Sequence, residues 1–338
     1  MNILAIESSC DETAVAIVRD GRKVLTDCIA SQVALHREYG GVVPEIASRK
    51  HIEAIYSLAD AALAESKLTR REIDAIAVTY APGLIGAVLV GVNFAKAAAL
   101  AMDVPLIPVH HIRGHIAANY LAFPELEPPF LCLVVSGGHT MIVEVKDYTV
   151  MRILGTTLDD AAGECFDKVA RVLGMPYPGG AALDRCSQGA DSTKYALPRS
   201  KPGANPYDMS FSGLKTAAIN CIHHAEQVGE RMDIPALCAS FSAAVSDTLV
   251  PRVEMALRET GLKKVAIAGG VAANSRIRTA LLACAQSCGA SVYLPPLKLC
   301  GDNGAMIGSQ AYYEYLAGHT ADMTLNAYAT KSLLGEAL

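Results

Sequence analysis

The apolar run Ile3-Leu4-Ala5-Ile6, the polar residues 7–13 and the apolar run Ala14-Val15-Ala16-Ile17-Val18 stand together near the start of the chain. Two short apolar runs on either side of a polar turn are typical of a β-hairpin. The same order returns at residues 130–145, where Ser136-Gly137-Gly138-His139-Thr140 forms the polar turn. This repeat predicts that one α/β lobe has been duplicated.

Helical and strand patterns alternate around the two hairpins. Helices are expected at residues 45–67, 86–102, 160–173 and 235–260, and buried strands at 73–78 and 264–268. Such alternation predicts an α/β fold, and 338 residues suit two domains. The prolines of residues 105–108 predict a crossing between the lobes, and residues 198–208 a surface loop in the second lobe.

Composition favours a cytoplasmic protein that does not enter a membrane. The ten cysteines include no C-x-x-C pair, which fits a reducing compartment, and Met1 leads into an apolar strand with no basic leader. The apolar residues 84–102 are interrupted by glycine, asparagine and lysine, so a buried helix is favoured over a membrane span. A net charge of −5 and the absence of tryptophan give no indication of nucleic acid binding.

Paired glycines suggest an anion site without a known phosphate-binding motif. The sequence contains neither a P-loop nor a G-x-G dinucleotide fingerprint. It does contain Gly137-Gly138, Gly179-Gly180 and Gly269-Gly270, each beside an expected strand end or helix start. Backbone N–H groups at such glycines can approach a phosphate closely. An ordinary tight turn is the favoured interpretation of any single pair, whereas three pairs together favour a shared anion site.

Two histidines are candidate metal ligands. His111 and His115 stand four residues apart, which places both on one face of a helix, where they could hold one divalent cation. A metalloprotease is disfavoured because Ile112 occupies the position of the required glutamate. Asp302 is a candidate third ligand. The alternatives are a polar helix face for the histidines and a helix N-cap for Asp302.

Other polar residues allow both a functional and a structural interpretation. Asp11 and Glu12 in the first turn could orient a nucleophile or accept a proton, or could simply suit the turn. Asp167 lies off the apolar face of its expected helix, four residues before Arg171, so a surface ion pair is the alternative. Asn274 could contact a ribose or a base edge, or could cap a helix.

The chain resembles one family along essentially its whole length, the bacterial tRNA N6-adenosine threonylcarbamoyltransferases (TsaD family). The motifs that carry the resemblance occur in order: residues 7–13, His111-x-x-x-His115, residues 135–140, 159–164, Phe166-Asp167-Lys168, Tyr177-Pro178-Gly179-Gly180, residues 210–216, Ala268-Gly269-Gly270-Val271 and Asp302-Asn303. Two departures are minor: Ala181 stands where many members have proline, and Gly301 where threonine is common.

The resemblance implies a fold, a reaction and a set of site residues. The fold would be an actin-like (ASKHA, ribonuclease H-like) pair of α/β lobes with an active-site cleft between them. The reaction would transfer the threonylcarbamoyl group of threonylcarbamoyl-AMP to N6 of adenosine 37 in tRNAs reading ANN codons, releasing AMP. His111, His115 and Asp302 would hold one Fe2+ or, alternatively, Zn2+ ion, and Asp11 with Glu12 would be catalytic. The adenylate would be bound by Val134, Val135, Ser136, Gly137, Gly138, Asp167, Gly180, Asp184 and Asn274.

Lobe boundaries and partners are also implied. We expect residues 1–109 with about 303–338 in an N-terminal lobe, and residues 110–302 in a C-terminal lobe that carries most of the nucleotide and metal site. The protein partners would be TsaB, a related actin-like protein, and the ATPase TsaE. An actin-fold ATPase or small-molecule kinase is the alternative function, and a non-enzymatic scaffold is a further one.

Overall fold

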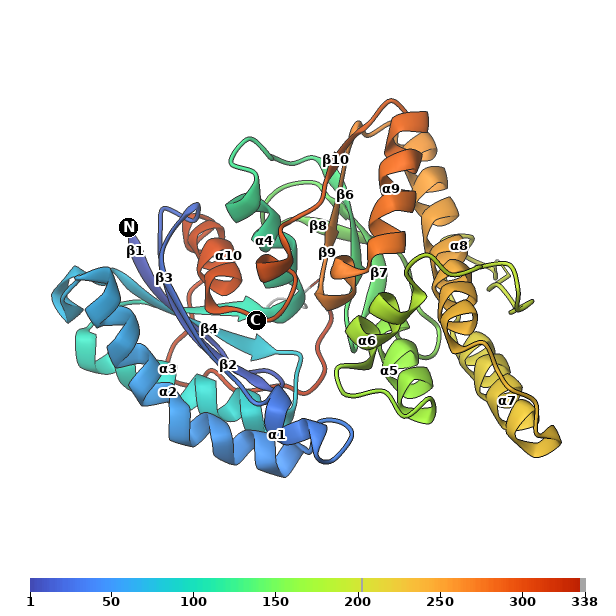
Figure 1. The fold of residues 1–338 in the computed structure, drawn as a ribbon. Helices are drawn as coiled ribbons and strands as arrows, with labels where there is room; N and C mark the ends of the chain where they lie inside the picture. The colour runs from blue at the N-terminus through green and yellow to red at the C-terminus, as the bar shows by residue number, and fades with distance from the viewer. Residues whose placement is uncertain (202, 335–338) are drawn as a thin grey trace. The chain divides into compact units, whose positions relative to one another are not determined.

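The computed structural model describes residues 1–201 and 203–334, which fall into two compact units. Among the described residues, the first unit comprises 1–128, 146–151 and 295–334, and the second comprises 129–145, 152–201 and 203–294. Each unit is built on one five-stranded sheet (Figure 1). The expected α/β class with two related lobes is therefore confirmed.

The sheet of the first unit has the order β3 (Lys23–Ser31), β2 (Glu12–Arg19), β1 (Asn2–Glu7), β4 (Ala75–Ala81) and β5 (Leu106–His110). Strand β1 pairs antiparallel with β2 and parallel with β4. The first expected hairpin is thus present, and its polar turn joins β1 to β2. Because β1 is central, the side chains at its end are buried.

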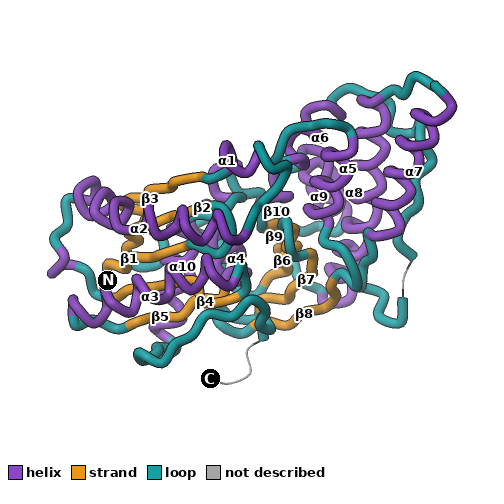
Figure 2. The backbone as a smooth tube through the Cα atoms, turned by 90° about the horizontal axis from the view of Figure 1, so that it is seen from below, coloured by secondary structure: helices purple, strands orange, loops and turns teal. Residues whose placement is uncertain are grey.

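Helices cover both faces of this sheet (Figures 1 and 2). Successive side chains of a strand point to opposite faces, so β1 contributes to two cores. Leu4 and Ile6 belong to the core shared with α2 (Pro44–Ser66) and α3 (Ile85–Met102). Ile3 and Ala5 belong to the core that contains residues of α4 (His111–Ala122) and α10 (Gly304–Leu316). The remaining helical segments of this unit are α1 (Val33–Arg37), η1 (Arg70–Glu72) and η3 (Leu297–Leu299).

The second unit repeats this arrangement. Its sheet has the order β10 (Ser291–Tyr293), β9 (Lys264–Ala268), β6 (Phe130–Val135), β7 (Thr140–Val145) and β8 (Met151–Thr156). Strand β6 pairs antiparallel with β7 and parallel with β9, as β1 does with β2 and β4. The helical segments of this unit are α5 (Ala162–Val172), α6 (Gly179–Ser187), α7 (Ser212–Val228), α8 (Ile234–Thr260), η2 (Gly270–Ala273) and α9 (Ser275–Ser287). The shared pairing supports the duplication that the two hairpins predict.

Residues 105–108 do not form the expected crossing between lobes. They lie at the start of β5, where Pro108 is the partner of Val78 in the parallel ladder with β4. Since β5 is an edge strand, a proline can be accommodated although it lacks an N–H to donate. The compact units also differ from the expected lobes, since residues 110–128, 146–151 and 295–302 belong to the first unit. Within these segments, α4 packs on α10 of the first unit.

Two helices, α3 and α8, are long and apolar enough to cross a membrane by length and composition alone. In the most apolar window of each, 33% of the residues of α3 and 78% of those of α8 are buried inside the structure. Core helices of globular proteins have the same composition, so this observation is weak evidence for a membrane span. Within residues 198–208, the described residues form no helix or strand, in line with the expected loop.

Candidate functional site

His111 and His115 occupy one face of α4, at its start. Strand β5 ends at His110, whose ring accepts the N–H of Ile112 (3.3 Å) and so caps the new helix. The four-residue spacing places the two rings side by side, with centroids 4.5 Å apart. Both side chains are buried. His111 and His115 therefore lie on one face of a helix, as their spacing in the sequence predicts.

Asp302 reaches this pair because α4 and α10 pack against each other. A Cβ atom at Gly114 of α4 would lie only 2.6 Å from Cδ1 of Ile307 on α10, so glycine permits the approach. Asp302 immediately precedes Asn303, and the Asn303 side chain accepts the N–H of Met306 (2.8 Å) as the N-cap of α10. The N-cap of α10 is thus Asn303 and not Asp302, which was the alternative interpretation of Asp302.

The three side chains form a group that can share one ion. Oδ1 of Asp302 lies 3.2 Å from Nε2 of His115 and 3.6 Å from Nε2 of His111. One ligand atom from each residue lies within 4.8 Å of the other two. The other ring nitrogen of His115 is buried with no hydrogen-bond partner among the described residues. Two imidazoles and a carboxylate are a suitable donor set for a divalent metal such as iron or zinc.

Glu7 lies directly behind His111 and was not among the expected site residues. It is fully buried at the end of β1, and its Oε2 atom accepts from Nδ1 of His111 at 3.0 Å. Burial acts to raise the pKa of Glu7, but attraction to His111 and its hydrogen bond lower the pKa below its ordinary value overall. An acidic residue at the buried end of a central strand is the sequence signal that could have identified it.

Asp11 and Glu12 lie in the same unit as the histidines, at the start of β2. Asp11 is buried, and Glu12 accepts a hydrogen bond from the Ser31 hydroxyl at 3.0 Å. Burial, together with the negative charges of Asp11 and Asp302, raises the pKa of Glu12 to about 9. A raised pKa favours the protonated form of Glu12, which can donate a hydrogen bond.

In the second unit, the turn after β6 is open on one side. The N–H of Ser136 donates to the carbonyl of His139 (2.8 Å), and a Cβ atom at Gly163, in the first turn of α5, would lie 2.4 Å from the Ser136 carbonyl. In contrast, Cβ atoms at Gly137 and Gly138 would meet nothing within 4 Å. Backbone at this turn is thus held from one side and accessible from the other.

Strand β9 pairs in parallel with β6, so the glycine turn that follows β9 lies next to the turn that follows β6. Ala268 pairs with Val134, and Gly269 adopts φ of +92°. A Cβ atom at Gly269 would lie 2.4 Å from the carbonyl oxygen of Val135, so only glycine fits this contact. Two of the three glycine pairs singled out in the sequence, Gly137-Gly138 and Gly269-Gly270, therefore follow the carboxyl ends of the neighbouring strands β6 and β9.

Of the four remaining expected substrate residues, Asp167 and Gly180 bond to each other, whereas Asp184 and Asn274 bond to other residues. Oδ1 of Asp167 on α5 accepts the N–H of Gly180 at the start of α6 (3.1 Å). Asp184 on α6 accepts from the hydroxyl of Ser275 (2.8 Å), which follows Asn274. The Asn274 side chain caps α9 by accepting the N–H of Ile277 (3.1 Å), as the alternative interpretation of this residue predicts.

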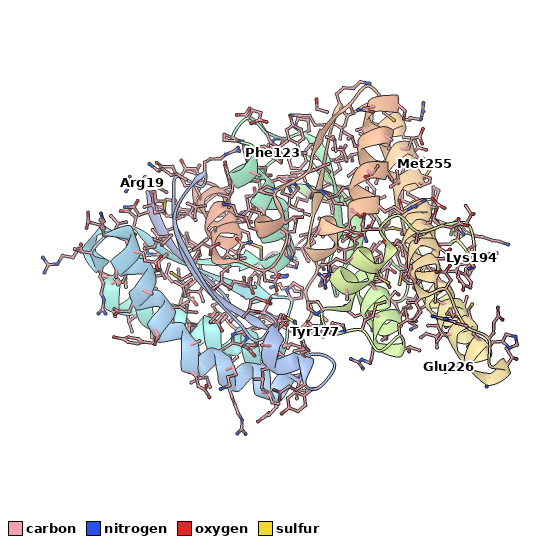
Figure 3. The ribbon with its side chains drawn as sticks, viewed as in Figure 1. Arg19, Phe123, Tyr177, Lys194, Glu226 and Met255 are labelled. Carbon is pink, nitrogen blue, oxygen red and sulfur yellow. The ribbon has the colours of Figure 1, made fainter. Side chains whose placement is uncertain are left out.

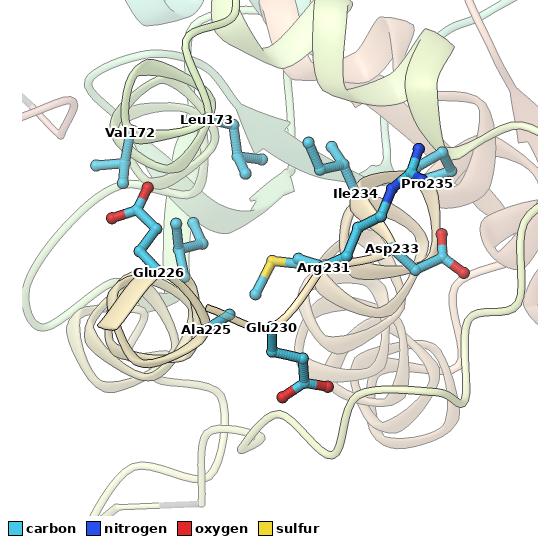
Figure 4. Close-up of a pocket in the computed structure, with 11 residues that line it drawn as sticks. Val172, Leu173, Ala225, Glu226, Glu230, Arg231, Asp233, Ile234 and Pro235 are labelled. Atoms are coloured by element: carbon cyan, nitrogen blue, oxygen red, sulfur yellow. The ribbon is translucent and has the colours of Figure 1, made fainter. Parts of the chain in front are cut away.

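A pocket of about 740 Å³ lies elsewhere in the second unit, between the ends of α5 and α7 and the start of α8 (Figure 4). Glu226 on α7, labelled in Figures 3 and 4, is one of its polar lining residues. Apolar side chains such as Leu173, Ile222 and Ile234 line it as well. None of the candidate site residues lines this pocket.

Two copies of one mixed sheet with associated helices define a class of protein, the actin-like ATPase fold. The structure is similar to full-length HypF in its phosphate- and nucleotide-bound form, with a TM-score of 0.63 and 15% identity over 98% of this chain and 47% of that chain. It is also similar to component A of (R)-2-hydroxyglutaryl-CoA dehydratase from Acidaminococcus fermentans, with a TM-score of 0.53 and 14% identity over 94% and 99% of the two chains. At these identities, the likeness establishes the fold alone.

Sequence comparison identifies the family. Residues 23–309 match the model of the family TsaD, tRNA N6-adenosine threonylcarbamoyltransferase. The chain is 53% identical to the protein of that name from Moorella thermoacetica over 96% of this chain and 95% of that protein, and 50% identical to the one from Clostridium botulinum (strain 657 / Type Ba4) over 97% and 96%. The chain belongs to the tRNA N6-adenosine threonylcarbamoyltransferase family. It is therefore a transferase whose substrate is tRNA, as the resemblance in its motifs implied.

Proposed function

We propose that this transferase moves the threonylcarbamoyl group of threonylcarbamoyl-AMP to N6 of adenosine 37 in tRNAs that read ANN codons, with release of AMP. The observation that carries the proposal is the convergence of His111, His115 and Asp302, whose ligand atoms lie within 4.8 Å of one another. Family membership supplies the reaction class, and the triad supplies a site at which an anionic substrate can be held.

We propose that the triad binds one Fe2+ ion, with Zn2+ as the alternative. The nitrogen and oxygen donors of the triad suit both metals. Three protein ligands leave coordination positions open, as catalytic sites do. A bound cation would supply charge neutralisation for the phosphate or carboxylate of the substrate.

The second unit offers groups for the adenylate. We propose that residues 134–138, Asp167, Gly180, Asp184 and Asn274 bind it. The accessible turn at Gly137 and Gly138 supports this role, because a Cβ atom at either residue would meet nothing within 4 Å. Backbone N–H groups in such a turn can stabilise an anion. The contacts of Asp167 with Gly180 and of Asp184 with Ser275 would hold α6 and the start of α9 in position.

Asp11 and Glu12 are proposed as the catalytic residues. In the transfer, N6 of adenosine forms a bond to the carbamoyl carbon, the bond from that carbon to the phosphate oxygen breaks, and N6 loses a proton. The acyl group is already activated as a mixed anhydride, so the task of the protein is to hold a weak nucleophile in line. Because the raised pKa of Glu12 favours its protonated form, we assign the orientation of the amine, or acceptance of its proton, to Asp11.

TsaB and TsaE are proposed as protein partners, in the cytoplasm. Apolar side chains on the two packed helices α2 and α3 support a partner surface on the first unit: Ile52, Tyr56, Ile85 and Leu89 are all exposed. Exposed apolar groups on neighbouring helices commonly mark a protein interface.

The test is reconstitution with threonylcarbamoyl-AMP and unmodified tRNA, read by mass spectrometry of the nucleosides. Threonylcarbamoyladenosine should form with the parent protein and the two partners, and only traces should form with Asp11→Asn. A parallel assay follows phosphate release from ATP without tRNA. Rapid ATP hydrolysis by the chain alone, with no modified nucleoside in the first assay, would replace this proposal with an ATPase or kinase function.

A further inference from the structure

The carboxylate of Glu7 has three donors around it and no exposure to solvent. Its Oε1 atom accepts the N–H of Ser9 at 2.5 Å. Its Oε2 atom accepts from the Thr79 hydroxyl at 2.6 Å and from Nδ1 of His111 at 3.0 Å. A fully buried carboxylate with this many donors is held in one orientation, and it faces a ring that is itself a candidate metal ligand.

This arrangement determines which nitrogen of His111 can bind a metal. An ionised carboxylate can only accept hydrogen bonds, so the contact with Glu7 favours the tautomer in which Nδ1 of His111 carries the proton. The Ser9 hydroxyl, 3.1 Å from the same nitrogen, can accept as well as donate and is compatible with this tautomer. The lone pair of the neutral ring is then on Nε2, the atom that lies 3.6 Å from Oδ1 of Asp302. Carboxylates that fix a ligating histidine in this way also make it a stronger donor.

We propose that Glu7 is a positioning residue that holds His111 in the tautomer and orientation needed to bind a metal, an inference that rests on the metal-binding part of the proposed function. Glu7 does not itself contact the substrate in this proposal. It acts through His111.

Replacement of Glu7 by glutamine should reverse the tautomer with little change in volume. The backbone N–H of Ser9 is only a donor, so the amide oxygen should stay on its side. The amide NH2 group would then face Thr79 and Nδ1 of His111. The Thr79 hydroxyl can turn and accept. The Ser9 hydroxyl, 3.1 Å from Nδ1 of His111, can either donate to this nitrogen or accept from it, but Nδ1 can accept from the amide only if the ring proton moves to Nε2. That nitrogen would lose the lone pair required for a metal.

Thr79→Val is the matched control. Thr79 is 1% exposed, and valine has nearly the same shape, so this change removes one hydrogen bond from the same Oε2 atom. It leaves the contact between Glu7 and His111 in place. If Glu7 served only the packing of the turn, Glu7→Gln and Thr79→Val would both lose stability. Glu7→Gln would then lose no more Zn2+ affinity than Thr79→Val.

The experiment measures the affinity of the full-length, metal-free protein for Zn2+ by competition with a chromophoric chelator. His115→Ala gives the background from cysteines, and thermal unfolding of the metal-free proteins reports folding. Glu7→Gln should bind Zn2+ about 10–100-fold more weakly than the parent, whereas Thr79→Val should stay within about threefold. Glu7→Asp keeps a carboxylate acceptor but places it farther from His111, because the side chain is shorter. Its Zn2+ affinity should therefore lie between those of Glu7→Gln and Thr79→Val. This variant replaces Glu7→Gln in the test if Glu7→Gln does not fold.

Equal Zn2+ affinity for the parent and Glu7→Gln, or an equal loss for Thr79→Val, would overturn the inference while leaving the proposed transfer reaction intact. A parent that binds no Zn2+ above the His115→Ala background would overturn it as well. Because no tRNA or adenylate is used, the expected order of affinities would stand even if the parent failed to modify tRNA. The two proposals therefore fail separately.

Discussion

Nε2 of His115 lies 3.2 Å from Oδ1 of Asp302, although one residue is on α4 and the other precedes α10. The opposite nitrogen of the same ring, Nδ1, is buried without a hydrogen-bond partner among the described residues. A buried polar atom left unsatisfied costs about 1–3 kcal/mol, and a stabilising interaction elsewhere on the same ring can compensate for this cost. Metal binding at Nε2 would provide that compensation.

His115→Ala should remove metal binding while the fold survives. Loss of one of three ligands should weaken Zn2+ binding by more than about 100-fold, because even loss of an outer partner costs about 10–100-fold. Metal content after dialysis and circular dichroism measure the two effects. His36→Ala is the control, since His36 is also fully buried but bonds to Gln32 instead of the triad. Metal retention by His115→Ala at the level of His36→Ala would contradict the assignment.

Gly137→Ala should separate substrate binding from stability. Its Cβ atom would enter open space beside the turn, so the free energy of unfolding should change by less than about 0.5 kcal/mol. If the adenylate lies on this turn, the added methyl should raise KM for threonylcarbamoyl-AMP about tenfold or more. Gly213→Ala, equally unobstructed but in α7, should leave KM unchanged. An unchanged KM for Gly137→Ala would remove this turn from the site.

Arg22→Leu should destabilise the first unit. The guanidinium donates to the hydroxyls of Tyr313 (2.6 Å) and Tyr148 (3.0 Å) and to the carbonyls of Tyr120, Phe123 and Leu126. Loss of these donors leaves several partly buried acceptors unsatisfied, and we expect the free energy of unfolding to fall by about 2–4 kcal/mol. Urea denaturation measures it. Lys23→Leu, an exposed neighbouring position, should change stability by less than about 0.5 kcal/mol. Equal effects for the two variants would argue against a structural role for Arg22.

Asp27→Asn should change how stability depends on pH. Burial raises the pKa of Asp27 to about 6, although the backbone N–H groups of Gly304 and Ala305 act to lower it. A carboxyl whose pKa is higher in the folded state binds more protons there than in the unfolded state. Its contribution to stability is therefore lost as pH rises from about 4 to about 6.

The stability of Asp27→Asn relative to the parent should thus rise between pH 4.5 and pH 7, by on the order of 2 kcal/mol. Urea denaturation of both proteins at these two pH values gives the difference, in which the other titrating groups cancel. Thr26→Val, at the neighbouring buried position, serves as the control because it introduces no change in titration. A relative stability that stays constant or falls would show that Asp27 is not protonated by the fold in this range.

The sequence permitted much of the local structure to be predicted. The hairpin of β1 and β2 and that of β6 and β7 occur where alternating apolar runs and polar turns placed them. Four expected long helices begin and end within two residues of α2, α3, α5 and α8. These features depend on neighbours in the chain, so periodicity and local chemistry suffice to indicate them.

Predictions that depended on packing between distant segments were less successful. Residues 105–108 were interpreted as a crossing between lobes because prolines stand at both ends of the stretch. However, β5 lies at the sheet edge, where a missing N–H is tolerated. Glu7 was interpreted as part of a turn, and its contact with His111 connects the end of β1 to the start of α4. No local pattern reports such a pair.

By itself, the sequence determined the α/β class, the duplicated hairpins, the family and the face of α4 that carries His111 and His115. Only the tertiary structure decided that Asp302 reaches those rings, that Asn303 and not Asp302 caps α10, and that Glu7 stands behind His111. The reason is physical: spacing along one helix fixes which side chains share a face. The third ligand and its supporting carboxylate come from other elements, and close packing at Gly114 brings the first of these to α4.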